Sequence, residues 1–237
     1  MSIETFVQHT IFRSPWIHRV LPAFTSALVA FAIGYVFMVT PLERVMGAAQ
    51  KIFYFHVGSA LSAYGAIALV FLSSVMYLVD RKPAWDLMNE AASSIAFLLC
   101  SIVLVSGMIW GHSAWNVWFR WEPRLATFLF LWLIVLSCVL LRSVLPDDSR
   151  RRTLGAVMGI IAAVNIPIVI FSIKLLARNE QLHPEVVAQQ GLQDPRYVTG
   201  LLISVAAVAC LSVWLFFVRL GNAALRAEVD AHFRRRG

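Results

Sequence analysis

Long apolar runs alternate with short polar segments along the whole chain. Six runs have almost no charged side chain and reach about 20 residues, the length that an α-helix needs to cross a bilayer. They extend over Leu21–Val39, Val57–Val79, Ala91–Trp110, Leu125–Leu145, Leu154–Ile173 and Val198–Val218. The first run is long for the apolar region of a signal peptide, so we interpret it as an uncleaved span. The pattern predicts an all-α integral membrane protein with six transmembrane helices.

Composition agrees with this interpretation. Of the 237 residues, 59% are hydrophobic and 14% are charged, and the mean hydropathy is +0.74. Soluble domains carry about 25% charged residues. We therefore expect an N-terminal tail over residues 1–20, one six-span membrane domain with an external binding site over 21–218, and a basic C-terminal tail over 219–237.

The distribution of basic residues predicts the orientation in the membrane. If the six runs are spans, thirteen Lys and Arg residues lie on the side of the two termini and seven lie on the other side. Because cytoplasmic loops are enriched in Lys and Arg, both termini are expected in the cytoplasm of a bacterial inner-membrane protein. The formal net charge of +7 is then explained by contact with the lipid bilayer, and nucleic-acid binding is not expected.

Tryptophan is concentrated in one segment between the third and fourth runs. Four of the eight tryptophans fall within Trp110–Arg124, which the predicted orientation places outside the membrane. Trp115, Trp118 and Trp121 recur every three residues and would share one face of a short helix. An interfacial aromatic belt is an alternative explanation. The concentration in a single loop favours a binding surface for a flat, apolar ligand.

Two histidines lie on the same predicted side as this loop. His56 is expected in the first outside loop, just before the second span, and His183 in the loop between the fifth and sixth spans. Imidazole is a common ligand of haem iron, and the two side chains could bind the iron from opposite faces. The alternative interpretation is that each histidine has only a structural role, as most isolated histidines near helix ends do. His112, inside the tryptophan loop, is either an adventitious surface residue or a transient ligand.

The remaining polar residues of the loop suggest binding instead of catalysis. Arg120 and Arg124 are candidates for charge-assisted bonds to haem propionates, although arginines near a membrane also reach lipid headgroups. Glu122 is expected to pair with an arginine or to cap the fourth span. Because no second carboxylate lies beside it, hydrolytic acid–base chemistry has little support. The three cysteines lie inside apolar runs and are interpreted as small hydrophobic residues.

The tryptophan segment resembles the motif WGxxWxxWxWD of the CcmC family, the haem-handling membrane protein C of cytochrome c maturation. The matching residues are Trp110, Gly111, Trp115, Trp118 and Trp121, with Glu122 where the family usually has Asp. The segments Arg124-Leu125-Ala126-Thr127 and Val164-Asn165-Ile166-Pro167-Ile168 are also similar to the family. The resemblance extends over the second to sixth spans. Glu122 keeps the charge of the family's Asp but carries it one methylene group further out.

The resemblance implies a non-enzymatic protein with an external site for non-covalently bound haem b. It implies that His56 and His183 are the axial iron ligands. The expected haem-binding residues are His56, His183, Trp110, Gly111, Trp115, Trp118, Trp121, Glu122 and Arg124. It also implies that haem is presented to a membrane-anchored periplasmic haem chaperone, with an ABC-type partner complex nearby.

Three other functions are compatible with six spans. A membrane b-type cytochrome would carry histidines within its spans, and the six apolar runs contain none. A permease subunit of an ABC-type haem transporter would move haem across the bilayer. A structural scaffold would bind no haem.

Overall fold

The computed structural model describes residues 14–44, 46–145, 148–176 and 194–234, and the regular elements of these ranges are helical. Six helices are long and apolar enough to cross a membrane, as the sequence predicts. The first comprises η2 (Trp16–Val20), α2 (Leu21–Gly34) and η3 (Tyr35–Val39), and the others are α3 (Gln50–Asp80), α4 (Pro83–Trp115), α5 (Pro123–Val144), α6 (Asp148–Leu176) and α7 (Pro195–Arg234).

Several helices extend beyond the predicted apolar runs. The predicted second span starts at Val57, but α3 begins at Gln50; α4 ends at Trp115, beyond the predicted Trp110. At a rise of about 1.5 Å per residue, the 33 residues of α4 reach roughly 50 Å, which exceeds the ~30 Å hydrocarbon core. The ends of these helices therefore project past the apolar part of the bilayer.

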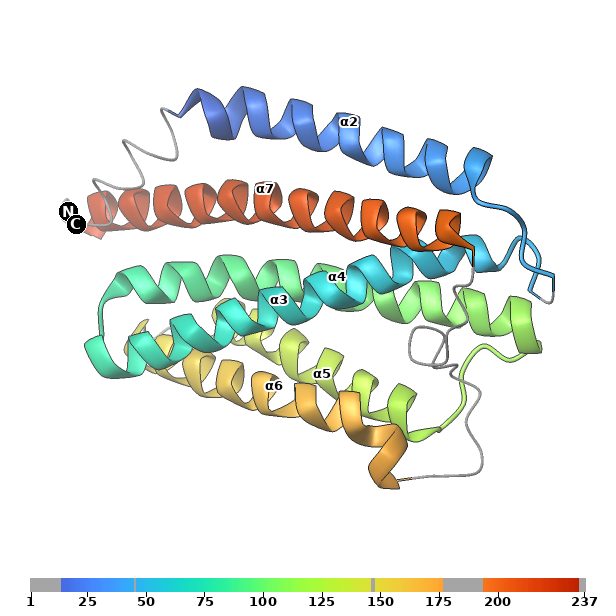
Figure 1. Ribbon diagram of the computed structural model, residues 1–237. Coiled ribbons are helices and arrows are strands. Elements are labelled where there is room, and N and C mark those ends of the chain that lie inside the picture. The colour runs from blue at the N-terminus through green and yellow to red at the C-terminus, as the bar shows by residue number, and fades with distance from the viewer. Residues whose placement is uncertain (1–13, 45, 146–147, 177–193, 235–237) are drawn as a thin grey trace.

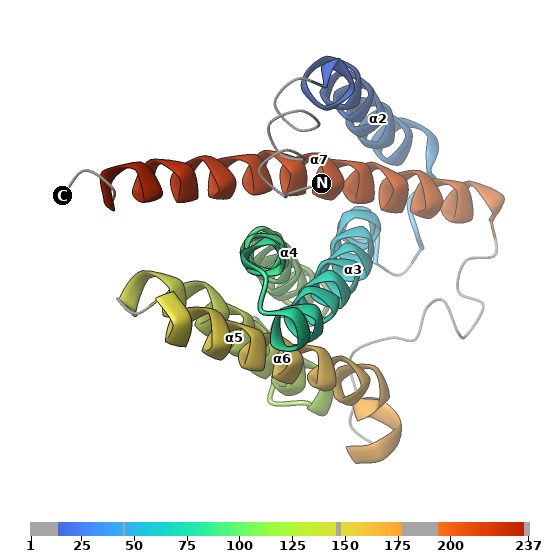
Figure 2. The ribbon, with the colours of Figure 1, turned by 90° about the vertical axis from the view of Figure 1, so that its left-hand side faces the viewer.

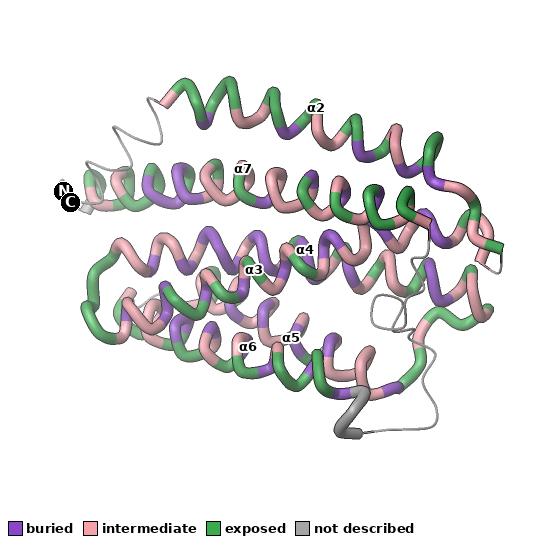
Figure 3. The backbone as a smooth tube through the Cα atoms, viewed as in Figure 1, coloured by how far each residue is buried: buried purple, intermediate pink, exposed green. Residues whose placement is uncertain are grey.

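The helices form three layers. The antiparallel pair α3 and α4 lies in the middle, α5 and α6 cover one side, and α7 followed by α2 covers the other (Figures 1 and 2). The largest buried apolar cluster is shared by α3, α4, α5 and α6 and includes Ile67, Leu99, Leu131, Val135 and Val169. Buried positions are frequent on α3 and α4, whereas α2 is mostly exposed (Figure 3). The free thiols of Cys100 and Cys138 are buried, in agreement with their predicted role as small hydrophobic residues.

The turn between the two helices of the central pair is closed by local backbone chemistry. Arg81 has a left-handed conformation, with φ of 57°, and its N–H donates to the Tyr77 carbonyl at 2.8 Å. Pro83 then occupies the first turn of α4, where its missing N–H costs nothing. This short turn sets α3 against α4 and brings His56 beside the last turns of α4.

A buried lysine ties the first span to α3. Lys51 donates through Nζ to the Val36 carbonyl at 2.7 Å and to both the carbonyl and hydroxyl oxygens of Thr40 at 2.5 Å. These carbonyls belong to the end of the first span, where helical carbonyls lack intrahelical partners and a cation is favourable. The interaction orients the first turn of α3, which carries the chain toward His56.

Candidate functional site

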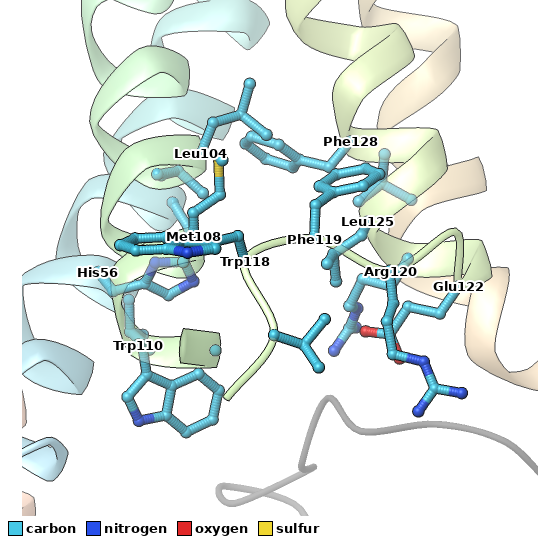
Figure 4. A pocket seen from close by; sticks show the side chains of 18 of the residues that line it. His56, Leu104, Met108, Trp110, Trp118, Phe119, Arg120, Glu122, Leu125 and Phe128 are labelled. Atoms are coloured by element: carbon cyan, nitrogen blue, oxygen red, sulfur yellow. The ribbon is translucent and has the colours of Figure 1, made fainter. Parts of the chain in front are cut away.

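A cavity of about 220 Å³ lies at the end of the bundle where α3 begins and α4 ends. Its walls come from α3, α4 and α5, and the α4–α5 connection lies across one side (Figure 4). Val169 of α6 also lines it. Most of the lining is aliphatic or aromatic. The polar and charged side chains in the lining are His56, Tyr64, Arg120, Glu122 and Arg124.

His56 is not in a loop, as the sequence suggested, but in the second turn of α3. The prediction was wrong because Lys51 and His56 interrupt the apolar sequence, so the expected span starts only at Val57, whereas the helix already begins at Gln50. The imidazole projects toward the cavity beside Trp118 and Met108 (Figure 4). Its Nδ1 lies 3.0 Å from the Ser106 hydroxyl of α4. The absence of histidine from the apolar runs spoke against a b-type cytochrome. The position of His56 within a spanning helix weakens that argument.

Three of the four predicted tryptophans line the cavity. Trp110 and Trp115 lie in the last turns of α4 and pack edge to face, with ring centroids 5.0 Å apart. Trp118 follows in the α4–α5 connection and lines the cavity while remaining 54% exposed. Trp121 does not line the cavity; it is 75% exposed and packs edge-on against Phe119.

The predicted aromatic face of one short helix is wrong. Asn116 adopts a left-handed conformation, with φ of 56°, and its N–H donates to the His112 carbonyl at 2.9 Å. This closes α4 just after Trp115, because asparagine tolerates a conformation that other side chains avoid. Trp118 and Trp121 are therefore placed by an irregular segment, and only Trp118 turns to the cavity.

Gly111 is required by the path of this segment. The chain folds back after Trp115 so closely that a Cβ on Gly111 would lie 3.0 Å from the Val117 carbonyl oxygen. Only a residue without a side chain allows this approach comfortably. The glycine of the tryptophan motif thus explains how Trp118 returns over the end of α4.

His112 supports Trp118 by ring stacking. The two rings are stacked, with centroids 4.1 Å apart and planes 5° from parallel. His112 itself does not line the cavity. Its Nδ1 is buried and forms no hydrogen bond in the described part of the chain. The geometry indicates that His112 packs against Trp118 and so supports an aromatic side chain of the cavity lining.

We predict that His112→Ala loosens the α4–α5 connection, whereas His112→Phe preserves it. An aromatic pair contributes about 0.5–1.5 kcal/mol, so tryptic cleavage after Arg120 should accelerate roughly two- to tenfold in the alanine variant. Mass spectrometry identifies the cleaved bond. His232→Ala, on the far part of α7, is the matched control, and equal cleavage of both alanine variants would contradict the supporting role.

Charged residues occupy one side of the cavity mouth. Glu122 is only 6% exposed and stands at the N-cap position of α5, but its side chain makes no capping bond. It lies on the same side of the mouth as Arg120 (Figure 4). Arg124, in the first turn of α5, donates through Nη2 to the Ile170 carbonyl of α6 at 3.5 Å. The mouth thus joins apolar walls to fixed positive and negative groups.

The structure brings together all predicted site residues except two. Trp121 lies beside the cavity instead of lining it, and His183 lies outside the described residues. Tyr64, Ser106 and Gly107 were missed. Tyr64 sits in the apolar run of α3, where a single aromatic residue gives no functional signal. Ser106 and Gly107 are identifiable only from their contact with His56.

Comparison with known proteins places the whole chain in one family. A family model described as "CcmC: Heme exporter protein C" matches residues 3–235. The chain belongs to the CcmC family. It is therefore a non-enzymatic, multi-pass membrane protein of the haem exporter C family of cytochrome c maturation.

CcmC proteins of several bacteria are similar to the chain over most of its length. The Heme exporter protein C of Bradyrhizobium diazoefficiens is 30% identical over 215 residues, which cover 89% of this chain and 81% of the relative. The protein of the same name from Rhodobacter capsulatus is 28% identical, with 85% of each chain covered. That of Escherichia coli is 27% identical, with 86% of this chain and 82% of the relative covered.

Proposed function

We propose that this CcmC protein holds haem b non-covalently in the cavity and presents it to a membrane-anchored haem chaperone in the periplasm. In this proposal His56 is one axial ligand of the iron and His183 is the other. The observation that carries the proposal is a histidine that projects into an aromatic cavity with arginines at its mouth.

The chemistry of the lining suits a haem. A porphyrin supplies four nitrogens to the iron, so the protein needs to add only one or two axial ligands. His56 offers one such nitrogen from the cavity wall. Trp110, Trp115 and Trp118 offer apolar surface for the flat ring. Arg120 and Arg124 offer guanidinium groups that suit the two propionates.

The distribution of charge between the two ends of the bundle supports a periplasmic site with both termini in the cytoplasm. The start of the first span and the end of α7 lie at the end opposite the cavity (Figure 1). The α3–α4 turn with Arg81 and Lys82 lies there too, as does the start of α6 with Arg150–Arg152. Because Lys and Arg favour the cytoplasmic side of the inner membrane, the cavity end faces the periplasm.

The tasks of the chain in this proposal are ligation, shielding and release. Two histidine ligands would occupy both faces of the iron and keep oxygen chemistry away from it. Release then requires that a ligand from the chaperone replaces one histidine. An ABC-type partner complex would act beside this protein, and the chain itself needs no covalent step.

The proposal is tested by transfer of haem between purified proteins. The detergent-solubilised protein, loaded with haem and freed of excess, is mixed with the apo form of the membrane-anchored chaperone, and the two are separated before spectra are recorded. We expect haem to move to the chaperone from the wild-type protein. Retention of all haem on this protein in the presence of the chaperone would contradict the delivery role.

Two alternative functions give different outcomes in matched assays. A permease subunit would move haem across the membrane of sealed vesicles when a partner ATPase and ATP are supplied. A redox subunit would show haem reduction coupled to quinol oxidation. Haem transfer to the chaperone without either activity distinguishes the delivery role from both.

A further inference from the structure

The strongest unassigned feature of the site is the contact between His56 and two adjacent residues of α4. Ser106 and Gly107 face the imidazole from the neighbouring helix, 50 positions further along the chain. The Ser106 hydroxyl lies 3.0 Å from His56 Nδ1. A Cβ on Gly107 would lie 3.2 Å from Cε1 of the same ring. The two residues therefore contact one edge of the imidazole.

The hydrogen bonds of Ser106 determine which nitrogen of His56 carries the proton. The Ser106 hydroxyl lies 2.6 Å from the Ile102 carbonyl oxygen, one turn earlier in α4. A carbonyl oxygen can only accept, and a hydroxyl has a single hydrogen, so Ser106 donates to Ile102. The Ser106 oxygen then accepts the N–H of His56 Nδ1. In a neutral imidazole this leaves the lone pair on Nε2.

This tautomer is the one that metal ligation through Nε2 requires. Histidines that bind metals commonly donate their other ring N–H to an oxygen acceptor, which fixes the ring orientation and makes the ligating nitrogen more basic. Gly107 contributes by leaving space. Because Cε1 lies between the two ring nitrogens, a side chain at this position would press on the ring between the anchored nitrogen and the free one.

We propose that Ser106 and Gly107 are positioning residues that hold the His56 imidazole with Nδ1 protonated and Nε2 available for an iron ligand. The inference rests on the proposed haem-binding function of the cavity. It adds that the ligand is oriented by α4, the helix that also carries Trp110 and Trp115. The aromatic wall and the ligand are thus aligned by one rigid element.

The test compares serine variants on α4. We expect Ser106→Ala to weaken haem binding by about tenfold, the lower end of the range for outer partners of metal-ligating histidines. The absorption and electron paramagnetic resonance spectra of the remaining ferric haem should also change. Ser106→Thr keeps a hydroxyl that can accept from Nδ1 and should remain close to wild type. Gly107→Ala should alter the spectra in the same direction as Ser106→Ala.

Ser113→Ala is the matched control. Ser113 lies on the same helix and makes the same bond to a carbonyl four residues earlier, to Ile109 at 2.9 Å, whereas the hydrogen bond to His56 from α4 is made by Ser106. Equal haem affinity and spectra for Ser106→Ala and Ser113→Ala would overturn the positioning role. A Ser106→Thr variant as impaired as Ser106→Ala would also overturn it, because the hydroxyl would then not be the important group.

The outcome for His56 separates this inference from the proposed function. If His56→Ala loses haem while Ser106→Ala equals its control, the positioning role alone is wrong. If His56→Ala retains haem with an unchanged spectrum, the assignment of the ligand itself is wrong. Size-exclusion profiles of every variant, compared with wild type, show that the measured proteins are folded.

Discussion

Replacing His56 with alanine is expected to lower the haem content of the purified protein roughly tenfold or more, because even outer partners of a ligating histidine are worth about 10- to 100-fold in affinity. His56 is the one histidine in the lining of the cavity among the residues that the structure describes. Without it the tryptophans still offer apolar contact, so weakly bound haem with an altered spectrum should remain. The measurement is haem per protein, together with oxidised and reduced absorption spectra.

Two controls make this experiment specific. His232→Ala removes a histidine from the far part of α7 and should leave haem content unchanged. His56→Gly leaves room for free imidazole beside Ser106, and added imidazole should restore the wild-type spectrum in this variant. His183→Ala tests the second predicted ligand and should also reduce haem content. Full haem content and an unchanged spectrum in His56→Ala would remove the basis of the proposed site.

Hydropathy was sufficient to predict the six helices but not where they end. A spanning helix must be apolar where it meets lipid, so each of the six runs is visible in the sequence. Near its ends a helix can also include polar and charged residues, which interrupt the apolar pattern. The first turns of α3 contain the buried Lys51 and the site residue His56, and the expected span therefore starts only after them, at Val57. For this reason the sequence assigned His56 to a loop.

The composition of the site was predictable, whereas its geometry was not. The tryptophan motif and His56 were identified from residue types, and the structure brings His56 and the motif residues other than Trp121 to one cavity. The spacing of Trp115, Trp118 and Trp121 indicated a helix, but the left-handed conformation of Asn116 overrides that periodicity. The contact between His56 and Ser106 joins residues 50 positions apart. A single sequence contains no pattern that reveals such a pair.

A second polar contact invisible to sequence patterns lies at the opposite end of the bundle. Arg142 of α5 is one of the thirteen basic residues that predict the orientation, and its side chain is largely buried against α4. Its Nη2 lies 2.8 Å from Asp86 Oδ1 and 2.9 Å from Asn89 Oδ1. Two further ion pairs complete the network. Arg142 Nη1 lies 3.5 Å from Glu90 Oε2, and Arg152 Nε lies 3.4 Å from Asp86 Oδ2. The network joins α4, α5 and α6 at the end opposite the cavity.

Asp86→Ala is expected to destabilise the protein by about 3–5 kcal/mol, because removing one partner leaves a buried charge without compensation. The side chains of Asp86 and Arg142 are only 7% and 11% exposed, so water cannot replace the lost carboxylate easily. The measurement is the free energy of unfolding in a denaturing-detergent titration. Arg151→Ala is the control, since the Arg151–Asp148 pair is more exposed and should contribute less than about 1 kcal/mol.

The double variant Asp86→Leu/Arg142→Met tests whether the instability of Asp86→Ala comes from the uncompensated charge of Arg142. Replacement of both partners by apolar residues of similar size removes the uncompensated charge, and such replacements are often neutral or stabilising. We therefore expect the double variant to be more stable than Asp86→Ala. The remaining loss comes from Arg152, which loses its contact with Asp86, and from Glu90, which loses its contact with Arg142. A double variant at least as unstable as Asp86→Ala would show that a specific function, and not charge compensation, retains the network.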